Sequence, residues 1–345
     1  MIDWEIFRSK LEQKLYPNRN PSKGGRPPFD VLIMLKITIL QALNGDLANE
    51  KTEYMLTDRA SWQRFVGINP GAKIPDENTI RDFKENVGSE TMEELFEIFN
   101  QNLLKNGVIT AKGTLVDATF NDVPRRRTTT KKENEALKKG EIPESLTPIE
   151  NAKSKEERAH NNRISQTDTD ATWAKKDNET HFGFKGHAAV DMESKIVTNV
   201  VVTTASVHDV KVYVRLICMA FIFLSAGIPV DFFVKYADSG YVGKDYVDIL
   251  KLIFKEICDT CFHVIKRATK GHKLTGQDKS YNRSVAKKRC RVEHVFGAIT
   301  NDMGGIHTKS IGLERNTRDI VIKFFAYNIK RAAFLFSKKE NMATA

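Results

Sequence analysis

The sequence has few cysteines and no long apolar run, and each shortage excludes a class of protein. Four cysteines in 345 residues cannot form a disulfide framework, which favours a reducing compartment. The longest uncharged apolar run, residues 216–230, is too short to cross a membrane, and the first ten residues lack the pattern of a secretory leader. Only 10 prolines and 20 glycines, with 41% hydrophobic residues, exclude collagen-like or wholly disordered chains. We therefore expect a globular, cytoplasmic protein without a membrane segment.

The charge is distributed unevenly along the chain. The formal net charge is +10, and residues 265–291 alone hold ten bases against one acid. Residues 76–97, by contrast, hold eight acids and two bases. Because clustered cations attract a phosphate backbone, residues 265–291 are predicted to contact nucleic acid, with a solvated basic surface as the alternative. The candidate phosphate-binding side chains are Lys266, Arg267, Arg283, Lys287, Lys288, Arg289 and Arg291.

Hydrophobic periodicity divides the chain into three parts. Residues 1–106 have helical spacing, with helices predicted at 29–43, 47–66, 76–87 and 89–105. Residues 107–302 add strand patterns at 113–120, 181–190, 195–204, 231–237 and 261–267, helices at 209–226, 243–255 and 283–301, and a charged insertion at about 121–172. Residues 303–345 form a helical extension with a helix at 316–336. The order predicts an α/β fold, a mixed sheet flanked by helices with an all-helical N-terminal domain.

Three acidic residues have placements that need a physical explanation. Asp117 lies within a predicted strand, Asp238 ends another, and Glu293 lies on a helix after the basic segment. A carboxylate in mid-strand is costly unless it is satisfied, and carboxylates that hold two hard divalent cations support phosphodiester chemistry. The pattern favours a metal site acting on nucleic acid. A hydrogen-bonded strand aspartate, and a Glu293 paired with Arg289 on a solvated helix face, are the alternatives.

Two other patterns suggest different chemistry. A single C-x-x-C pair joins Cys258 and Cys261, and a zinc site could include Cys290, His263 and His294, but no second pair has zinc-finger spacing. Residues 232–240 resemble the acidic loop of aspartic proteases, which needs a second copy that this chain lacks. Both are weaker interpretations than a phosphodiester site.

Seven short motifs in order resemble those of one enzyme family. Together they are similar to the DDE transposases of bacterial insertion sequences, in the branch called insertion sequence five, over about residues 20–335. The motifs are Gly25–Phe29, Ile74–Thr79, Leu115–Thr119, His181–His187, Ala205–Asp209, Tyr236–Tyr241 and Arg289–Gly297.

This resemblance implies an RNase H-like catalytic domain in which Asp117, Asp238 and Glu293 hold two Mg²⁺ or Mn²⁺ ions. Arg289 matches the arginine of the family's Y-R-E-K signature, whereas the tyrosine and lysine positions are Ala286 and Thr300.

The expected function is binding of an element's terminal inverted repeats, cleavage of the DNA and joining to target DNA. A nucleoid-associated homodimer is expected, with the N-terminal helices helping to bind the repeats or to dimerise. A catalytically silent DNA-binding derivative and a general nuclease of the same fold are the alternatives.

Overall fold

A computed structural model describes residues 2–17, 27–110, 112–124, 128–176, 178–209, 211–212, 235–237, 262–268 and 273–343. Asp238, the predicted helix at 243–255 and most of the predicted helix at 209–226 lie outside these ranges. Within them, no helix is both long enough and apolar enough to span a membrane.

The N-terminal region is helical, as predicted. A 3-10 turn (η1, Glu5–Phe7) and helix α1 (Arg8–Leu15) precede α2 (Val31–Leu43), α3 (Asn49–Asp58), α4 (Ala60–Val66) and α5 (Glu77–Lys105). The predicted helix at 47–66 is two helices, because the backbone is extended at Arg59. Helix α5 joins the helices predicted at 76–87 and 89–105 across a kink at Gly88, where φ is +71°. Asp76 caps α5 by accepting a hydrogen bond from the backbone N–H of Thr79.

In the part of the chain that the structure describes, a six-stranded mixed sheet forms the centre of the molecule. Its strands are β1 (Thr114–Asp122), β2 (Thr172–Lys176), β3 (Glu179–Asp191), β4 (Val197–Thr204), β5 (Lys235–Ala237) and β6 (Phe262–Val264). β3 pairs antiparallel with β1 on one edge and with β2 and β4 on the other. β5 lies parallel between β1 and β6. The sheet and its flanking helices confirm the predicted fold class, although β2 was not predicted.

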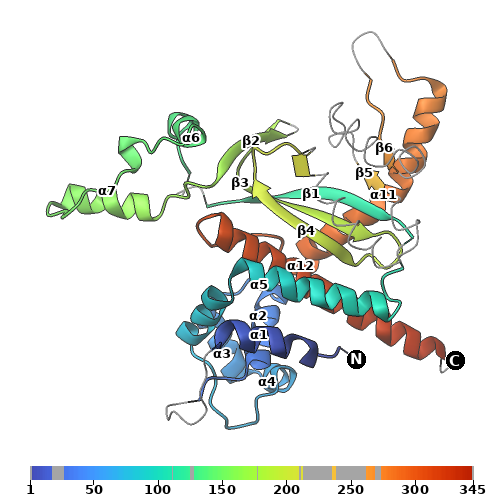
Figure 1. The fold of residues 1–345 in the computed structure, drawn as a ribbon, viewed down its shortest axis with the longest axis horizontal. Helices are drawn as coiled ribbons and strands as arrows, with labels where there is room; N and C mark the ends of the chain where they lie inside the picture. The colour runs from blue at the N-terminus through green and yellow to red at the C-terminus, as the bar shows by residue number, and fades with distance from the viewer. Residues whose placement is uncertain are drawn as a thin grey trace.

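The charged insertion forms a helical projection between β1 and β2. It contains α6 (Lys131–Lys138), a short 3-10 turn η3 (Glu144–Leu146) and α7 (Lys155–Ser165), and it extends away from the sheet (Figure 1). Glu133 joins these parts because its carboxylate accepts hydrogen bonds from Thr130, Ser145 and Arg163. Against the opposing effect of burial, these bonds lower the pKa of Glu133 to about 2. The insertion therefore has its own polar framework.

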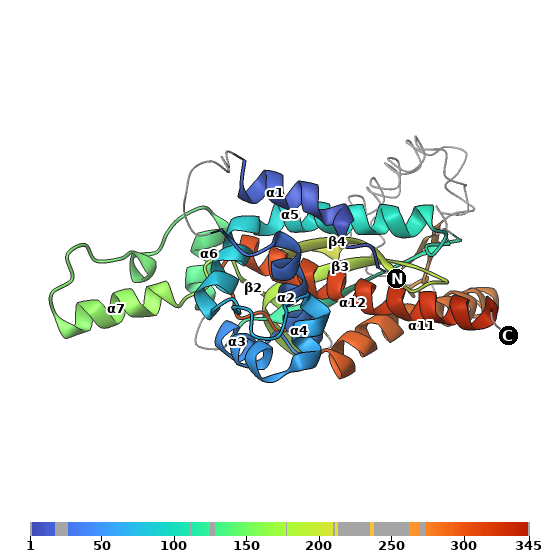
Figure 2. The same cartoon turned by 90° about the horizontal axis from the view of Figure 1, so that it is seen from below.

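Two long helices follow the sheet. Helix α11 (Gly276–Asp302) begins seven residues before its predicted start, because Thr275 and Asp278 form a reciprocal capping box. Helix α12 (Leu313–Ala343) lies between the sheet and the N-terminal helices (Figures 1 and 2). The Phe325 ring packs against Phe7 and Phe99, with ring centroids 5.5 and 5.6 Å away. One apolar core thus runs from the N-terminal helices through α12 to the sheet. The predicted domain boundaries stay a prediction.

The glycines of the His181–His187 motif allow close packing on β3. A Cβ at Gly183 would lie 2.1 Å from the backbone oxygen of Asn121 on β1. A Cβ at Gly186 would lie 3.1 Å from the Ile320 side chain on α12. Both positions therefore exclude a side chain unless a neighbour moves, and the neighbour at Gly183 is backbone.

Replacing Gly183 with alanine should destabilise the fold. The Gly183→Ala variant is expected to lose about 2 kcal/mol of unfolding free energy, because strand β1 must shift to admit the methyl group. Chemical denaturation measures the loss. Gly276→Ala is the matched control, since a Cβ at Gly276 meets no atom within 4 Å. Equal stability of the two variants would contradict the packing argument.

Candidate active site

Asp117 lies on the central strand of the sheet, on the face covered by α11 and α12. Because side chains alternate along a strand, Asp117 shares its face with Thr119 and Asn121. The Asn121 amide on this face donates to Thr308, which precedes α12, and to Asn316 in the first turn of α12. The Asp117 side chain, 22% exposed, therefore points towards the helical layer and remains accessible.

An ion pair joins Asp117 to helix α11. The Nη2 atom of Arg289 lies 3.3 Å from Oδ2 of Asp117, and both side chains are largely buried. The Oδ1 atom of Asp117 accepts a hydrogen bond of 2.9 Å from the backbone N–H of Ala118. The two contacts compensate the cost of a carboxylate in mid-strand. The predicted arginine and the predicted first aspartate therefore meet.

Glu293 lies one helical turn after Arg289. Residues four apart share a side of an α-helix, at a rise of about 6 Å, so Glu293 follows the Asp117 contact along the same side. The Glu293 residue is exposed and lines a hollow on α11 together with His294, Gly297 and Asn301. The structure therefore places Glu293 one helical turn from Arg289 on α11, and its meeting with Asp117 stays a prediction.

The register of β1 and β5 bears on Asp238. Thr114 pairs with Lys235 and Leu115 with Tyr236, in parallel. The same offset in residue number separates Asp117 from Asp238, which follows Ala237 directly in the sequence. Asp238 itself lies outside the described residues, so its meeting with Asp117 stays a prediction.

Tyr236, whose role the sequence did not reveal, connects β5 to α11. Lys288 donates a hydrogen bond of 2.7 Å to the Tyr236 hydroxyl, and its ammonium also lies over the Tyr236 ring. The His263 ring of β6 stacks on Tyr236 with centroids 4.9 Å apart. Burial, with the Lys288 charge adding to it, lowers the pKa of His263. Tyr236 begins the Tyr236–Tyr241 motif, and this was the one sequence feature that could have marked it as a site residue.

The other predicted cations have different surroundings. Lys266 pairs with Asp278 at 2.7 Å, and Nη1 of Arg291 donates to the Met192 carbonyl at 3.1 Å. All of the predicted phosphate-binding residues except Arg289 are exposed, and two of them, Arg283 and Lys287, lie one turn apart on α11.

A zinc site has no support in the part of the chain that the structure describes. No group of three histidine, cysteine, aspartate or glutamate side chains there is arranged to hold a metal ion. The His263 ring contacts Tyr236 instead, and Cys258 and Cys261 lie outside the described ranges. The absence of such a group cannot test the acidic trio either, because Asp238 also lies outside the described ranges.

A buried histidine lies behind Asp117 on the opposite face of the sheet. His187 pairs in register with Ala118, is fully buried, and has Nε2 3.1 Å from the Thr203 hydroxyl. Burial lowers the pKa of His187 to about 4, with the charges of Asp209 and Lys185 acting in opposite directions. The imidazole is therefore neutral in the folded protein at neutral pH.

The buried histidine predicts loss of stability in mild acid. The pKa of an unfolded histidine is about 6.5, so between pH 6.5 and 4 the unfolded chain binds the proton that folded His187 excludes. Unfolding free energy should fall as the pH falls through this window, by at most about 3 kcal/mol from His187. Urea denaturation across pH 4–7 should show a flatter profile for His187→Gln. The variant of exposed His307, His307→Gln, should keep the wild-type slope, and equal slopes for both variants would refute the assignment.

Comparison with known proteins identifies the family. The sequence model described as "Transposase DDE domain" matches residues 110–329, and the one described as "Transposase domain (DUF772)" matches residues 1–86. The chain therefore belongs to the DDE transposase family, whose members are metal-dependent enzymes that cut and transfer DNA. The predicted resemblance is confirmed at this level, and membership of the insertion sequence five branch stays a prediction.

One solved structure is also similar to this chain. It is a cryo-EM structure of the piggyBac transposase synaptic complex with hairpin DNA. The similarity covers 96% of this chain and 73% of that chain, with 10% sequence identity and a TM-score of 0.40.

Proposed function

We propose that this protein is the transposase of a bacterial insertion sequence of the insertion sequence five branch. It binds the terminal inverted repeats, hydrolyses phosphodiester bonds at the element ends and joins the freed 3′-hydroxyl groups to target DNA. The contact between Asp117 and Arg289, next to the strand that precedes Asp238, is the observation that supports this proposal most strongly.

The residues present fit a divalent metal site. Asp117 offers a partly exposed carboxylate, and Glu293 offers an exposed one a helical turn beyond Arg289. Such oxygen donors suit Mg²⁺ or Mn²⁺, and Asp238 would complete the set that holds two ions. Bound ions would supply charge stabilisation and an activated water for phosphodiester cleavage.

Arg289 and its neighbours act on the site in different ways. Arg289 offsets the negative charge of Asp117, which lowers the repulsion that a DNA phosphate meets there. Lys288 is a positioning residue, because its bond to the Tyr236 hydroxyl fixes α11 against β5. Helix α11, which carries Glu293, is thus held against β1, which contains Asp117, and against β5, which Asp238 follows in the sequence.

DNA approaches along the exposed basic side of α11 in this proposal. Arg283 and Lys287 lie one turn apart and are exposed. Their spacing suits contact with a phosphate backbone, whereas the acidic residues 76–97 face away from DNA. The N-terminal helices help to bind the repeats, and a homodimer holds the two element ends.

Substitution of the predicted aspartates tests catalysis separately from binding. Asp117→Asn and Asp238→Asn should each abolish Mg²⁺-dependent cleavage of DNA that carries the inverted repeat of the element. Salt-sensitive binding, measured by fluorescence anisotropy, should persist. Asp58→Asn, at the exposed end of α3, is the control that should cleave normally.

The outcomes separate the alternatives. Cleavage that survives Asp238→Asn would refute the acidic trio. Wild-type protein that binds repeat DNA but never nicks it in Mg²⁺ or Mn²⁺ would indicate a silent derivative. Equal cleavage of DNA without repeats would indicate a general nuclease.

The salt dependence of binding tests the basic side of α11. Lys287→Gln should reduce the slope of log affinity against log salt by about 0.9, because one fewer counterion is released from the duplex. The matched control is Lys105→Gln at the exposed C-terminal end of α5. Anisotropy titrations between about 50 and 200 mM salt measure the slope. A slope unchanged by Lys287→Gln would remove this residue from the DNA path.

A further inference from the structure

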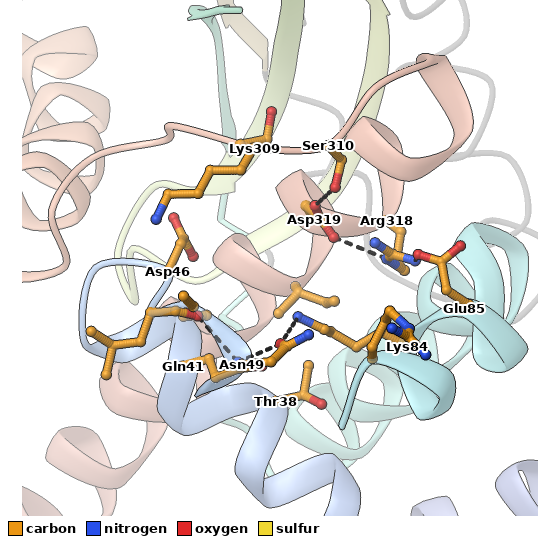
Figure 3. Close-up of a pocket in the computed structure, with 16 residues that line it drawn as sticks. Thr38, Gln41, Asp46, Asn49, Lys84, Glu85, Lys309, Ser310, Arg318 and Asp319 are labelled. Atoms are coloured by element: carbon orange, nitrogen blue, oxygen red, sulfur yellow. Dashed lines mark hydrogen bonds and ion pairs between the residues drawn. The ribbon is translucent and has the colours of Figure 1, made fainter. Parts of the chain in front are cut away.

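A polar cavity lies between the N-terminal helices and the start of α12. Its volume is about 340 Å³, and its wall comes from α2, α3, α5 and residues 308–322 (Figure 3). None of its lining residues belongs to the candidate active site. The volume falls in the range of about 300–1,000 Å³ that is typical of small-molecule sites.

The acidic side chains of the cavity have cationic partners in its wall. Asp46 pairs with buried Lys323 at 2.7 Å. Glu85 and Asp319 both pair with Arg318, each at 2.9 Å. The negative charges in the wall are therefore compensated before any ligand binds.

Lys84 differs from these residues because the partner of its ammonium is neutral. Its Nζ atom donates a hydrogen bond of 2.9 Å to Oδ1 of Asn49 (Figure 3). Burial lowers the pKa of Lys84. The charges of Asp319, Asp46 and Glu85 oppose this shift, and a bound phosphate would add a direct contact to the ammonium. Lys309 and Arg81, whose guanidinium pairs with Asp82 at 3.0 Å, also line the cavity.

Gln41 supplies an acceptor beside Lys84. Its side chain is 4% exposed, and Nε2 donates to Leu47, Asn49 and Thr52. Within the described part of the chain, its Oε1 atom has no hydrogen-bond donor, which is costly for a buried acceptor. Gln41 and Lys84 both donate to Oδ1 of Asn49, at 3.0 and 2.9 Å. Both residues therefore lie close together in the lining of the cavity.

We propose that this cavity binds a nucleotide unit, with its phosphate on Lys84 and a base amine or sugar hydroxyl donating to Oε1 of Gln41. The source is either a free mononucleotide or an unpaired nucleotide at a DNA end. Since the wall joins α2, α3 and α5 to α12, the ligand would hold the N-terminal helices against α12. Binding here needs no cleavage, so it can succeed or fail independently of the catalytic assignment.

Calorimetry and thermal unfolding of the full chain in phosphate-free, metal-free buffer test the proposal. Deoxyadenosine monophosphate at about 100 times its Kd should raise the Tm by about 4 °C or more. Inorganic phosphate, sulfate and deoxyadenosine should each bind at least tenfold more weakly, because each lacks one of the two groups. Equal stabilisation by sulfate and the nucleotide would overturn the proposal.

Variants of Lys84 locate the binding. Lys84→Met should weaken nucleotide affinity at least tenfold, and Lys84→Arg should restore part of it. Lys105→Met, at the far end of the same helix, should bind like the wild type. Equal affinities of Lys84→Met and Lys105→Met would overturn the site.

DNA probes identify the source of the nucleotide. A duplex with one unpaired terminal nucleotide is compared with a blunt duplex, each against wild type and Lys84→Met. A DNA source predicts that Lys84→Met weakens binding of the overhang duplex as well as of the mononucleotide, and leaves the blunt duplex unchanged. A free-nucleotide source predicts that it weakens only the mononucleotide. If it weakens neither ligand, the proposal is wrong.

Discussion

The ion pair between Arg289 and Asp117 is the contact on which the candidate site depends. It joins the central strand of the sheet to a helix that lies 172 residues later in the sequence. A buried carboxylate in mid-strand costs free energy unless it is paired. The cations of α11 repel one another, and a carboxylate beside them reduces that repulsion. The ion pair lowers both costs. It also fixes which side of α11 faces β1, and Glu293 lies one turn further along that side. The bond between Lys288 and Tyr236 fixes the same helix to the neighbouring strand β5.

Helix α12 provides the frame around this contact. Its Asn328 amide group bonds to Val197 of β4 and to Asn100 of α5, so a polar network crosses the apolar core. Asn121, on the same strand as Asp117, bonds to residues just before and within α12. The N-terminal helices, the sheet and the site therefore share one support. A ligand in the cavity beside α12 would act on this support.

Local patterns predicted much of the fold, and long-range contacts account for what they missed. Strands β1, β3 and β4 were predictable because apolar and β-branched residues alternate there. β2 has two lysines in five residues and pairs only at the edge of β3, so its pattern was too weak. The start of α11 depends on the capping box at Thr275, ahead of the apolar stripe. Asp117, Arg289 and Glu293 were recognisable as candidates, but no local pattern shows that Lys288 binds Tyr236.

The central claim is that Asp117, Asp238 and Glu293 hold the same metal ions. Electron paramagnetic resonance of Mn²⁺ titrated into the full chain measures this most directly. Asp117→Asn, Asp238→Asn and Glu293→Gln should each weaken Mn²⁺ binding at least tenfold, because each removes a carboxylate ligand. Any one of the three variants that binds Mn²⁺ as the wild type does would contradict a shared site.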